Sequence, residues 1–201
     1  MLRIIGAKLN DRYCILAVLL FLFPIQILMS AENDLIIDDR KTEDLRSMSG
    51  NEWALVTDGV MGGISKGQLS LDKIKSRACL RMLGDVRLEN NGGFVQVALD
   101  LSDDVTRNIS DYAGVLLEVY GNDEQYNIHL RTQDMWLPWQ SYRTTFTALS
   151  EWKTLYLPFD KFTPYRINKA LDIRRLKRIS FVAIGRAFNA DICIGKIGLY
   201  K

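Results

Sequence analysis

The feature that most constrains this chain is a series of short segments in which apolar and polar residues alternate. In the segment YNIHLR, for example, Tyr126, Ile128 and Leu130 are each followed by a polar residue. A period of two places the apolar side chains on one face of a β-strand. Turn-forming groups such as NNGG and GNDEQ separate these segments. No segment after residue 31 sustains a long helical period, so the sequence predicts an all-β protein.

The alternating segments define the expected architecture. We predict strands at residues 53–56, 67–74, 78–87, 93–101, 113–120, 125–133, 140–147, 152–158, 177–186 and 190–200. Residues 102–111 and 166–177 can each hold a short helix. Many short strands with glycine turns and no crossover helices indicate an antiparallel β-sandwich of the jelly-roll kind.

The N-terminus has the composition of a secretory signal peptide. Three basic residues precede an apolar run from Cys14 to Met29, which ends in small residues. The run is short for a membrane-spanning helix. We therefore expect residues 1–31 to be a signal peptide, with an uncleaved anchor as the alternative. The protein is then exported, and either periplasmic or membrane-associated. Residues 32–50 are polar and are interpreted as a linker or lead-in strand.

Charge gives no indication of a nucleic-acid partner. Outside residues 1–31 the basic and acidic residues are equal in number, so the slight positive charge of the whole chain belongs to the N-terminal segment. Nucleic-acid-binding domains usually carry a clear basic excess. We therefore expect no nucleic-acid partner.

Two cysteines, Cys79 and Cys193, lie outside the N-terminal segment. In an oxidising compartment they can pair. Each also lies in an apolar, strand-like run, where a buried free cysteine is common. We favour unpaired cysteines. Two sulfurs without a suitably placed histidine predict no zinc site, and no cofactor is expected.

The residues needed for catalysis do not form a recognisable pattern. His129 is the only histidine, it lies in the middle of a strand, and no nucleophile elbow is present. A Ser-His-Asp triad is therefore not expected. Acidic residues are common in turns, so a glycosidase-like pair of carboxylates cannot be selected among them. A hydrolase using such loop carboxylates is the least favoured interpretation, and we predict that the protein is not an enzyme.

The glycine-rich stretch DGVMGGISKGQ, residues 58–68, suggests a phosphate-binding loop at first sight. Its spacing matches neither common phosphate-binding motif, and the residues that follow alternate as a strand. Phosphate binding needs a helix N-terminus at that position. The stretch is better explained as a turn in which glycine supplies positive φ and Asp58 binds nearby backbone N–H groups.

Aromatic residues mark the one candidate ligand surface. Trp136, Trp139 and Tyr142 lie close together in the sequence, flanked by Arg131 and Arg143. Aromatic rings beside polar groups can bind sugars or peptide side chains. Alternatively, the rings close one end of the core and Pro138 fixes the turn. The second interpretation is favoured, and both remain open.

Several blocks together resemble the complex I intermediate-associated protein 30 family. They are DGVMGGISKGQL, NNGGFVQVALDL, YAGVLLEVYGNDEQYNIHLRT, EWKTLYLPFDKFTP and IGKIGLYK. The resemblance covers residues 51–201 and implies a galactose-binding-domain-like jelly roll. The matching signature positions are Asp58, Gly59, Met61, Gly62, Gly63, Ser65, Asn91, Gly92, Gly93 and Phe94. We expect these two glycine-rich blocks to pack together as fold determinants, with Asp58 and Asn91 capping backbone groups.

The resemblance also implies a function. Mitochondrial members of this family are assembly factors that help to build the respiratory NADH dehydrogenase by binding partners, without catalysing a reaction. We therefore expect a non-enzymatic, exported binding domain that acts through protein contacts as an assembly or accessory factor, possible partners being subunits of a membrane complex. The alternative is a carbohydrate-binding module that uses Arg131 and the aromatic residues as a platform.

Overall fold

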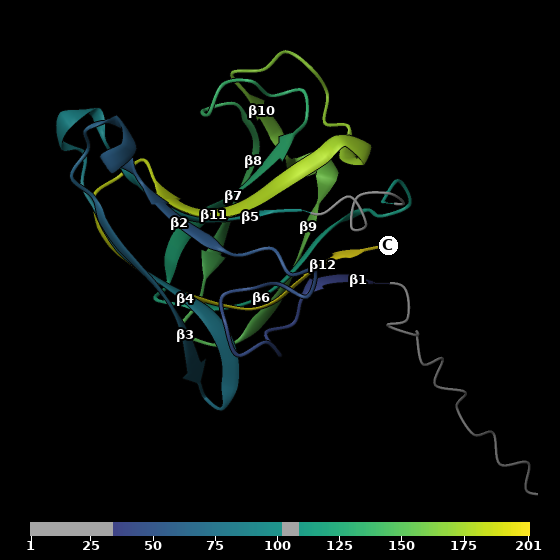
Figure 1. Ribbon diagram of the computed structural model, residues 1–201, viewed down its shortest axis with the longest axis horizontal. Coiled ribbons are helices and arrows are strands. Elements are labelled where there is room, and N and C mark those ends of the chain that lie inside the picture. The colour runs from purple at the N-terminus through teal and green to yellow at the C-terminus, as the bar shows by residue number, and fades with distance from the viewer. Residues whose placement is uncertain (1–33, 102–108) are drawn as a thin grey trace, which may run out of the picture. The chain divides into compact units, whose positions relative to one another are not determined.

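Figure 1 shows the computed structural model of the protein, which describes residues 34–101 and 109–201. The expected signal peptide at 1–31 and most of the short helix considered at 102–111 lie outside the described residues. Within them, the strands form two antiparallel sheets of six strands each, with a continuous hydrophobic core between them. The predicted all-β sandwich is confirmed.

The first sheet is built around the long C-terminal strand. Its members in spatial order are β3 (Lys66–Ile74), β4 (Arg77–Val86), β12 (Phe188–Tyr200), β6 (Gly114–Gly121) and β9 (Lys153–Pro158), and β1 (Leu35–Asp38) also pairs with β12. All of these pairings are antiparallel. β3 and β4 are consecutive in the sequence, whereas the other neighbouring strands of this sheet come from distant parts of the chain, as expected for a jelly roll.

The second sheet carries the surface on which the candidate site lies. Its members in spatial order are β10 (Thr163–Tyr165), β8 (Ser141–Ala148), β7 (Glu124–Thr132), β11 (Leu176–Ile184), β5 (Phe94–Asp100) and β2 (Ala54–Thr57). Short 3-10 helices lie in the connections: η1 (Asp58–Met61), η2 (Glu89–Asn91), η3 (Phe159–Lys161) and η4 (Ile173–Arg175).

The predicted strands agree with the observed ones to within a few residues. Strand β10 was missed because it is only three residues long and lies at a sheet edge, where Pro164 interrupts an alternating pattern. The helix considered over residues 166–177 is not formed. That segment contains only η4, in which Asp172 accepts a hydrogen bond from the backbone of Arg174, before β11 begins.

The described part of the lead-in, residues 34–50, is part of the fold. Strand β1 pairs with β12, and Trp53 Nε1 donates a hydrogen bond to Asp38 Oδ2 at 2.7 Å. The same carboxylate pairs with Arg40 at 3.0 Å, and all three side chains are buried. A buried carboxylate needs such partners because desolvation is costly. The sandwich therefore begins before residue 51.

The alternation seen in the sequence fills the space between the sheets. Tyr126, Ile128 and Leu130 of β7 face inward and are buried, as are the alternate residues of β6. Burying a large apolar side chain stabilises the fold by about 1.5–3 kcal/mol. Because the apolar residues occupy one face of β7, its polar residues are placed on the outer face of the second sheet.

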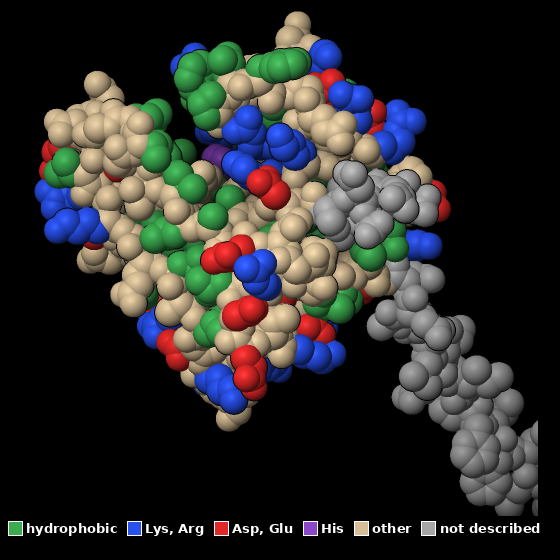
Figure 2. Space-filling view, in the orientation of Figure 1, with side chains coloured by type: hydrophobic (Ala, Val, Ile, Leu, Met, Phe, Trp, Pro, Cys, Tyr) green, Lys and Arg blue, Asp and Glu red, His purple; other side chains and the backbone are tan. Residues whose placement is uncertain are grey.

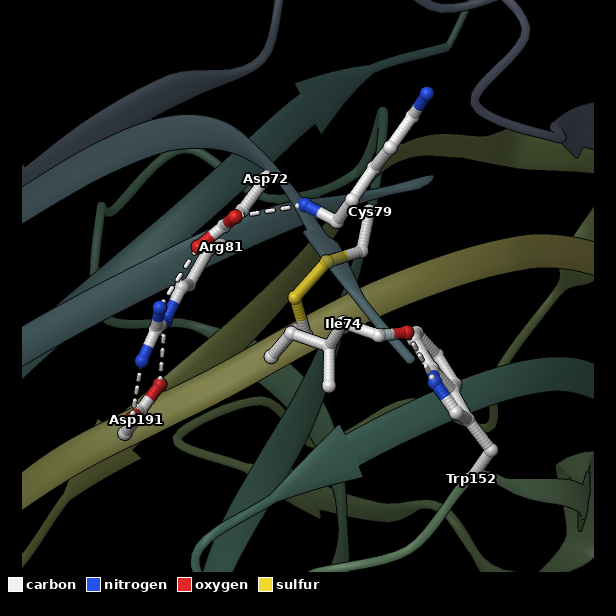
Figure 3. Close-up of a disulfide and its surroundings, with 8 residues drawn as sticks. Asp72, Ile74, Cys79, Arg81, Trp152 and Asp191 are labelled. Carbon is white, nitrogen blue, oxygen red and sulfur yellow. Dashed lines mark hydrogen bonds and ion pairs between the residues drawn. A yellow bond between two sulfur atoms is a disulfide. The ribbon is translucent and has the colours of Figure 1, made fainter. Parts of the chain in front are cut away.

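The two cysteines form a disulfide, so the favoured interpretation of unpaired thiols is wrong. Cys79 of β4 and Cys193 of β12 lie on neighbouring strands with their Cα atoms 5.4 Å apart, within the usual range for a disulfide. Figure 3 shows the bond beside Arg81, which pairs with both Asp72 and Asp191 at 2.7–2.8 Å. The apolar runs reflected burial of the cystine rather than of free thiols.

In the part of the chain that the structure describes, no helix has both the length and the apolar character needed to cross a bilayer.

Candidate functional site

The two glycine-rich blocks lie side by side at one end of the sandwich, as Figure 1 shows for η1 and η2. We call residues 58–65 and 88–94 the signature loops. Asp58 joins them. Its buried carboxylate accepts hydrogen bonds from the backbone N–H groups of Ser65 at 2.9 Å, Gly93 at 2.5 Å and Phe94 at 3.3 Å, and from the Ser65 hydroxyl.

The glycines of the signature loops make room for this carboxylate. A Cβ atom on Gly92 would lie 2.5 Å from Asp58 Oδ2, and one on Gly63 would overlap the same side chain. Gly62 has a φ of +89°, which side chains with a Cβ rarely adopt. The structure thus brings the two blocks together around Asp58. Asn91 differs from the expectation, since it is exposed with a φ of +58° and its side chain caps no described backbone group.

The signature loops present an apolar surface to solvent. Val60 is 73% exposed, and Met61, Ile64 and Leu88 are also exposed. We call these four side chains the loop patch. The buried Asp58 network fixes the backbone beneath them. Several large apolar side chains exposed on two loops that a buried network holds together are a candidate interaction surface.

A second feature lies on the outer face of the second sheet. Arg131 of β7 is paired directly with Arg178 of β11, and His129 lies between Ser180 of β11 and Arg143 of β8 in the same register. We call the surface formed by Arg131, Arg143, Arg178, His129 and Asp100 the arginine face. Figure 2 shows basic side chains gathered in a recess over this region, between two projecting parts of the surface.

The three guanidinium groups have different partners. Arg178 forms a bidentate pair with Asp100, at 2.6 and 2.8 Å. Arg131 donates to the backbone oxygens of Leu137 and Pro138 at 3.1 and 2.8 Å.

Arg143 donates to Ser141 Oγ at 2.8 Å, and its guanidinium carbon lies 3.5 Å from the centre of the Tyr165 ring. Among the described residues, Asp100 is the one carboxylate that forms an ion pair with any of the three arginines. The arginine face is therefore a net positive surface.

The predicted aromatic platform is only partly present. Trp136 and Trp139 are 90% and 48% exposed, in the loop between β7 and β8. Arg131 and Gln140 hold that loop, the latter by accepting hydrogen bonds from the backbone of Trp136 and Leu137.

Tyr142 does not belong to the platform, contrary to its selection as a candidate binding residue. It is 2% exposed, faces inward on β8, and donates its hydroxyl hydrogen to the backbone oxygens of Lys169 and Ala170. Its alternation within β8, opposite Leu130, places it in the core. The ring therefore fills the core, whereas the two tryptophans do not.

Burial and like charges lower the pKa values of Arg131, Arg143 and His129, whereas the hydrogen bonds to Asp100 raise the pKa of Arg178. Burial, followed by the nearby charge of Arg178, lowers the pKa of Arg131, and burial is the main cause of the lowered pKa of Arg143. Burial and then the charge of Arg143 lower the pKa of His129 to about 3. Arginine keeps its proton despite such shifts, but His129 is neutral at neutral pH.

The low pKa of His129 predicts an acid-dependent loss of stability. The unfolded histidine takes up a proton near pH 6.5, whereas the folded one resists protonation until about pH 3. Acidification from pH 6.5 therefore favours the unfolded state, with a slope approaching about 1.4 kcal/mol per pH unit. His129→Gln removes this group, so the free energy of unfolding of the variant should depend less on pH between 6.5 and 5. Urea unfolding at several pH values measures the difference, and equal slopes would contradict it.

Sequence reasoning selected Arg131, noted Arg143 only as a flanking residue, and missed Arg178 and Asp100. Each lies at an outward position of an alternating strand, which is a usable signal. Their proximity depends on β11 pairing with both β5 and β7, and β7 with β8, which alternation does not specify. In the described ranges no group of three or more His, Cys, Asp or Glu side chains is placed to hold a metal ion.

Solved structures share this fold at low sequence identity. A family 11 carbohydrate-binding module from Clostridium thermocellum, in complex with a β-1,3-1,4-mixed-linked tetrasaccharide, has a TM-score of 0.66 and 13% identity, covering 84% of this chain and 95% of that chain. The family 30 module of a cellulosomal cellulase from the same organism has a TM-score of 0.57 and 14% identity, with coverages of 84% and 97%. At these identities the likeness shows the fold alone.

Comparison of sequences identifies the family. No curated protein matches the chain significantly. The family model described as complex I intermediate-associated protein 30 matches residues 41–193, which include both signature loops and the arginine face. The resemblance noted from the glycine-rich blocks is confirmed, and the chain belongs to the complex I intermediate-associated protein 30 family.

Proposed function

We propose that this protein is an exported, non-enzymatic binding domain that acts through protein contacts as an assembly or accessory factor. The observation that carries the proposal is the loop patch, an exposed apolar surface on the loops that contain the family signature. Exposure of four large apolar side chains to water is unfavourable. A partner that covers them would stabilise the complex by about 25 cal/mol for each Å² of apolar surface buried. Because Asp58 fixes the loops, little conformational entropy is lost on binding.

Two observations support export. The N-terminal sequence has the composition of a signal peptide, and the Cys79–Cys193 disulfide suits an oxidising compartment. We therefore place the protein, as part of this proposal, in the periplasm or at a membrane surface. Subunits of a membrane complex are then suitable partners, since their exposed segments reach that compartment.

The test compares partner capture by wild-type and patch variants. Full-length protein with a C-terminal tag is expressed in its native host, crosslinked in fractionated cells, and analysed by mass spectrometry. We expect Val60→Ser with Met61→Ser to lose most of the captured partner while retaining the melting temperature. Leu71→Ser is the matched control, because Leu71 is an exposed leucine on β3, outside the signature loops. Equal capture by the patch variant and the wild type would reject the loop patch as the contact.

A second candidate function is carbohydrate binding. It is favoured by the exposed Trp136 and Trp139 in a loop held by Arg131 and Gln140, together with a fold shared with carbohydrate-binding modules. Affinity electrophoresis in gels containing mixed-linked β-glucan tests it directly. Retardation of the wild type, abolished in Trp136→Ala with Trp139→Ala, would favour this function; unretarded wild type would exclude this polysaccharide.

A further inference from the structure

We propose that the arginine face binds a carboxylate-bearing polypeptide segment, so that the partner of this domain presents aspartate or glutamate side chains to Arg131 and Arg143. The proposal rests on the proposed function, because it assigns the chemistry of the protein partner. It uses a surface separate from the loop patch, and the two can therefore be tested independently.

The first argument is the arrangement of charge. Arg131 and Arg178 are directly opposite each other on adjacent strands, and like charges in that position destabilise a sheet. Asp100 compensates Arg178 through its two hydrogen bonds. Among the described residues no carboxylate does the same for Arg131 or Arg143. An anionic ligand would supply the missing compensation.

The second argument is the unused donors. Nε of Arg131 and Nη1 of Arg143 form no hydrogen bond with a described residue, whereas their other nitrogens hold the loop and Ser141. Each of these two guanidinium groups therefore keeps one nitrogen without a described partner, while its contacts to the loop or to Ser141 restrict its orientation. Such donors suit carboxylate oxygens in geometry and charge.

The third argument is the histidine between these arginines and Ser180. His129 is 8% exposed, and its Nε2 atom is buried without a hydrogen-bond partner among the described residues. Buried polar atoms are almost always paired in folded proteins, so an unpaired one needs an explanation. A neutral imidazole with its proton on Nε2 is a donor. Because Nε2 is closed to a water-sized probe, a ligand oxygen reaches it only when a neighbouring side chain moves aside.

The surroundings favour a polypeptide over a sugar polymer. Sugar rings commonly stack on an open aromatic face of a binding surface. Arg143 covers one face of Tyr165, Tyr142 is in the core, and the exposed tryptophans lie in the adjoining loop.

Gln96 of β5 and Asn127 of β7 lie on this same face, because both are paired with Val182 of the intervening strand β11. Their side-chain amides can form hydrogen bonds with a peptide backbone. The equal numbers of acidic and basic residues outside residues 1–31 favour a short acidic segment over a long polyanion, which would require a more extended positive surface.

The test measures binding of a fluorescent hexaglutamate peptide to the full chain by anisotropy at low salt. We expect saturable binding that weakens as salt rises, because the contact is electrostatic. Arg131→Gln with Arg143→Gln should weaken it at least about tenfold, the loss of two charge-assisted contacts. Arg174→Gln is the matched control, since Arg174 is exposed and pairs with Asp172. A hexaglutamine peptide should not bind.

Because Arg131 also holds the Trp136 loop, Arg143→Lys is measured as a second variant. It keeps the positive charge but loses the planar donor set, so an intermediate affinity with an unchanged melting temperature supports the proposal. Hexaglutamate binding that is equal in all variants, or absent in the wild type, overturns it. Binding of polygalacturonate without binding of hexaglutamate also overturns it, in favour of an acidic sugar.

These outcomes separate the two proposals. Partner capture that depends on Val60 and Met61, with no hexaglutamate binding, would retain the proposed function and reject the acidic ligand. Hexaglutamate binding that requires Arg143, with no protein captured from cells, would retain the ligand chemistry and reject the assembly role.

Discussion

Replacing Asp58 with alanine is expected to lower the free energy of unfolding by at least about 3 kcal/mol, because the backbone N–H groups of Ser65, Gly93 and Phe94 lose their shared acceptor. Each buried donor left unpaired costs about 1–3 kcal/mol. For a domain of this size the melting temperature should fall by roughly 10 °C. Urea unfolding followed by tryptophan fluorescence measures the change.

Three comparisons isolate the role of the Asp58 carboxylate. Asp160→Ala removes an exposed carboxylate and should leave stability unchanged to within about 0.5 kcal/mol. Asp58→Asn keeps the shape of the side chain but turns an N–H₂ group toward a donor. Its free energy of unfolding should therefore lie between those of the wild type and the alanine variant. Gly92→Ala should lower stability while leaving residue 58 unsubstituted, because the new Cβ atom would lie 2.5 Å from Asp58 Oδ2. Equal stability of Asp58→Ala and Asp160→Ala would show that the loops are held by other contacts.

The pH dependence of Asp58 has a defined sign. Burial acts to raise its pKa, but the hydrogen bonds from Ser65, Gly93 and Phe94 outweigh burial and lower it below the ordinary value of 3.8. The stabilisation is therefore complete above pH 4 and is lost as the pH falls through the lowered pKa. His129 acts at higher pH, between 6.5 and 3, so the two groups can be separated in a pH series.

Local pattern was sufficient to predict most of the strands, their inward faces and the acceptor role of Asp58. Tyr126 and Ile128 are buried because alternation with period two specifies a face once a sheet exists. Asp58 could be predicted as an acceptor because a glycine-rich turn leaves backbone N–H groups without partners. The partner loop, however, was identified from the family resemblance, since the first loop does not specify which distant N–H groups reach the carboxylate.

The arginine face depends on strand order, which the sequence does not state. Arg131, Arg143 and Arg178 each lie at an outward position of a predicted strand. Their proximity follows only when β11 inserts beside β7 and β7 pairs with β8. Tyr142 was wrongly selected as a binding residue because it was grouped with residues close to it in the sequence. Its neighbours Trp136 and Trp139 lie in a loop, whereas Tyr142 is already inside β8 and follows that strand's alternation into the core.

The same limit applies to the disulfide. The sequence shows two cysteines, 114 residues apart, each in an apolar run. Their proximity is determined by the pairing of β4 with β12, in which Arg81 is opposite Cys193 and Leu80 is opposite Ile194. The disulfide therefore could not be derived from either apolar run alone. The only argument for it was that an exported chain enters an oxidising compartment.

Removing the disulfide by Cys79→Ala with Cys193→Ala is expected to lower the free energy of unfolding by about 2–4 kcal/mol, with the fold retained. The bond closes a loop spanning 114 residues and restricts the unfolded chain, while β4 and β12 stay paired through their backbone and through Arg81 with Asp191. The melting temperature should fall by roughly 5–15 °C.

A reducing agent distinguishes loss of the disulfide from damage to the core. It should lower the melting temperature of the wild type to that of the double variant and leave the variant unchanged. Thiol titration of the unfolded wild type should gain two thiols on reduction, one each from Cys79 and Cys193. If the exported protein gains none, the cysteines are free, and the disulfide no longer supports an oxidising compartment. A gain of two in protein isolated from its host would instead show that the chain has passed through such a compartment.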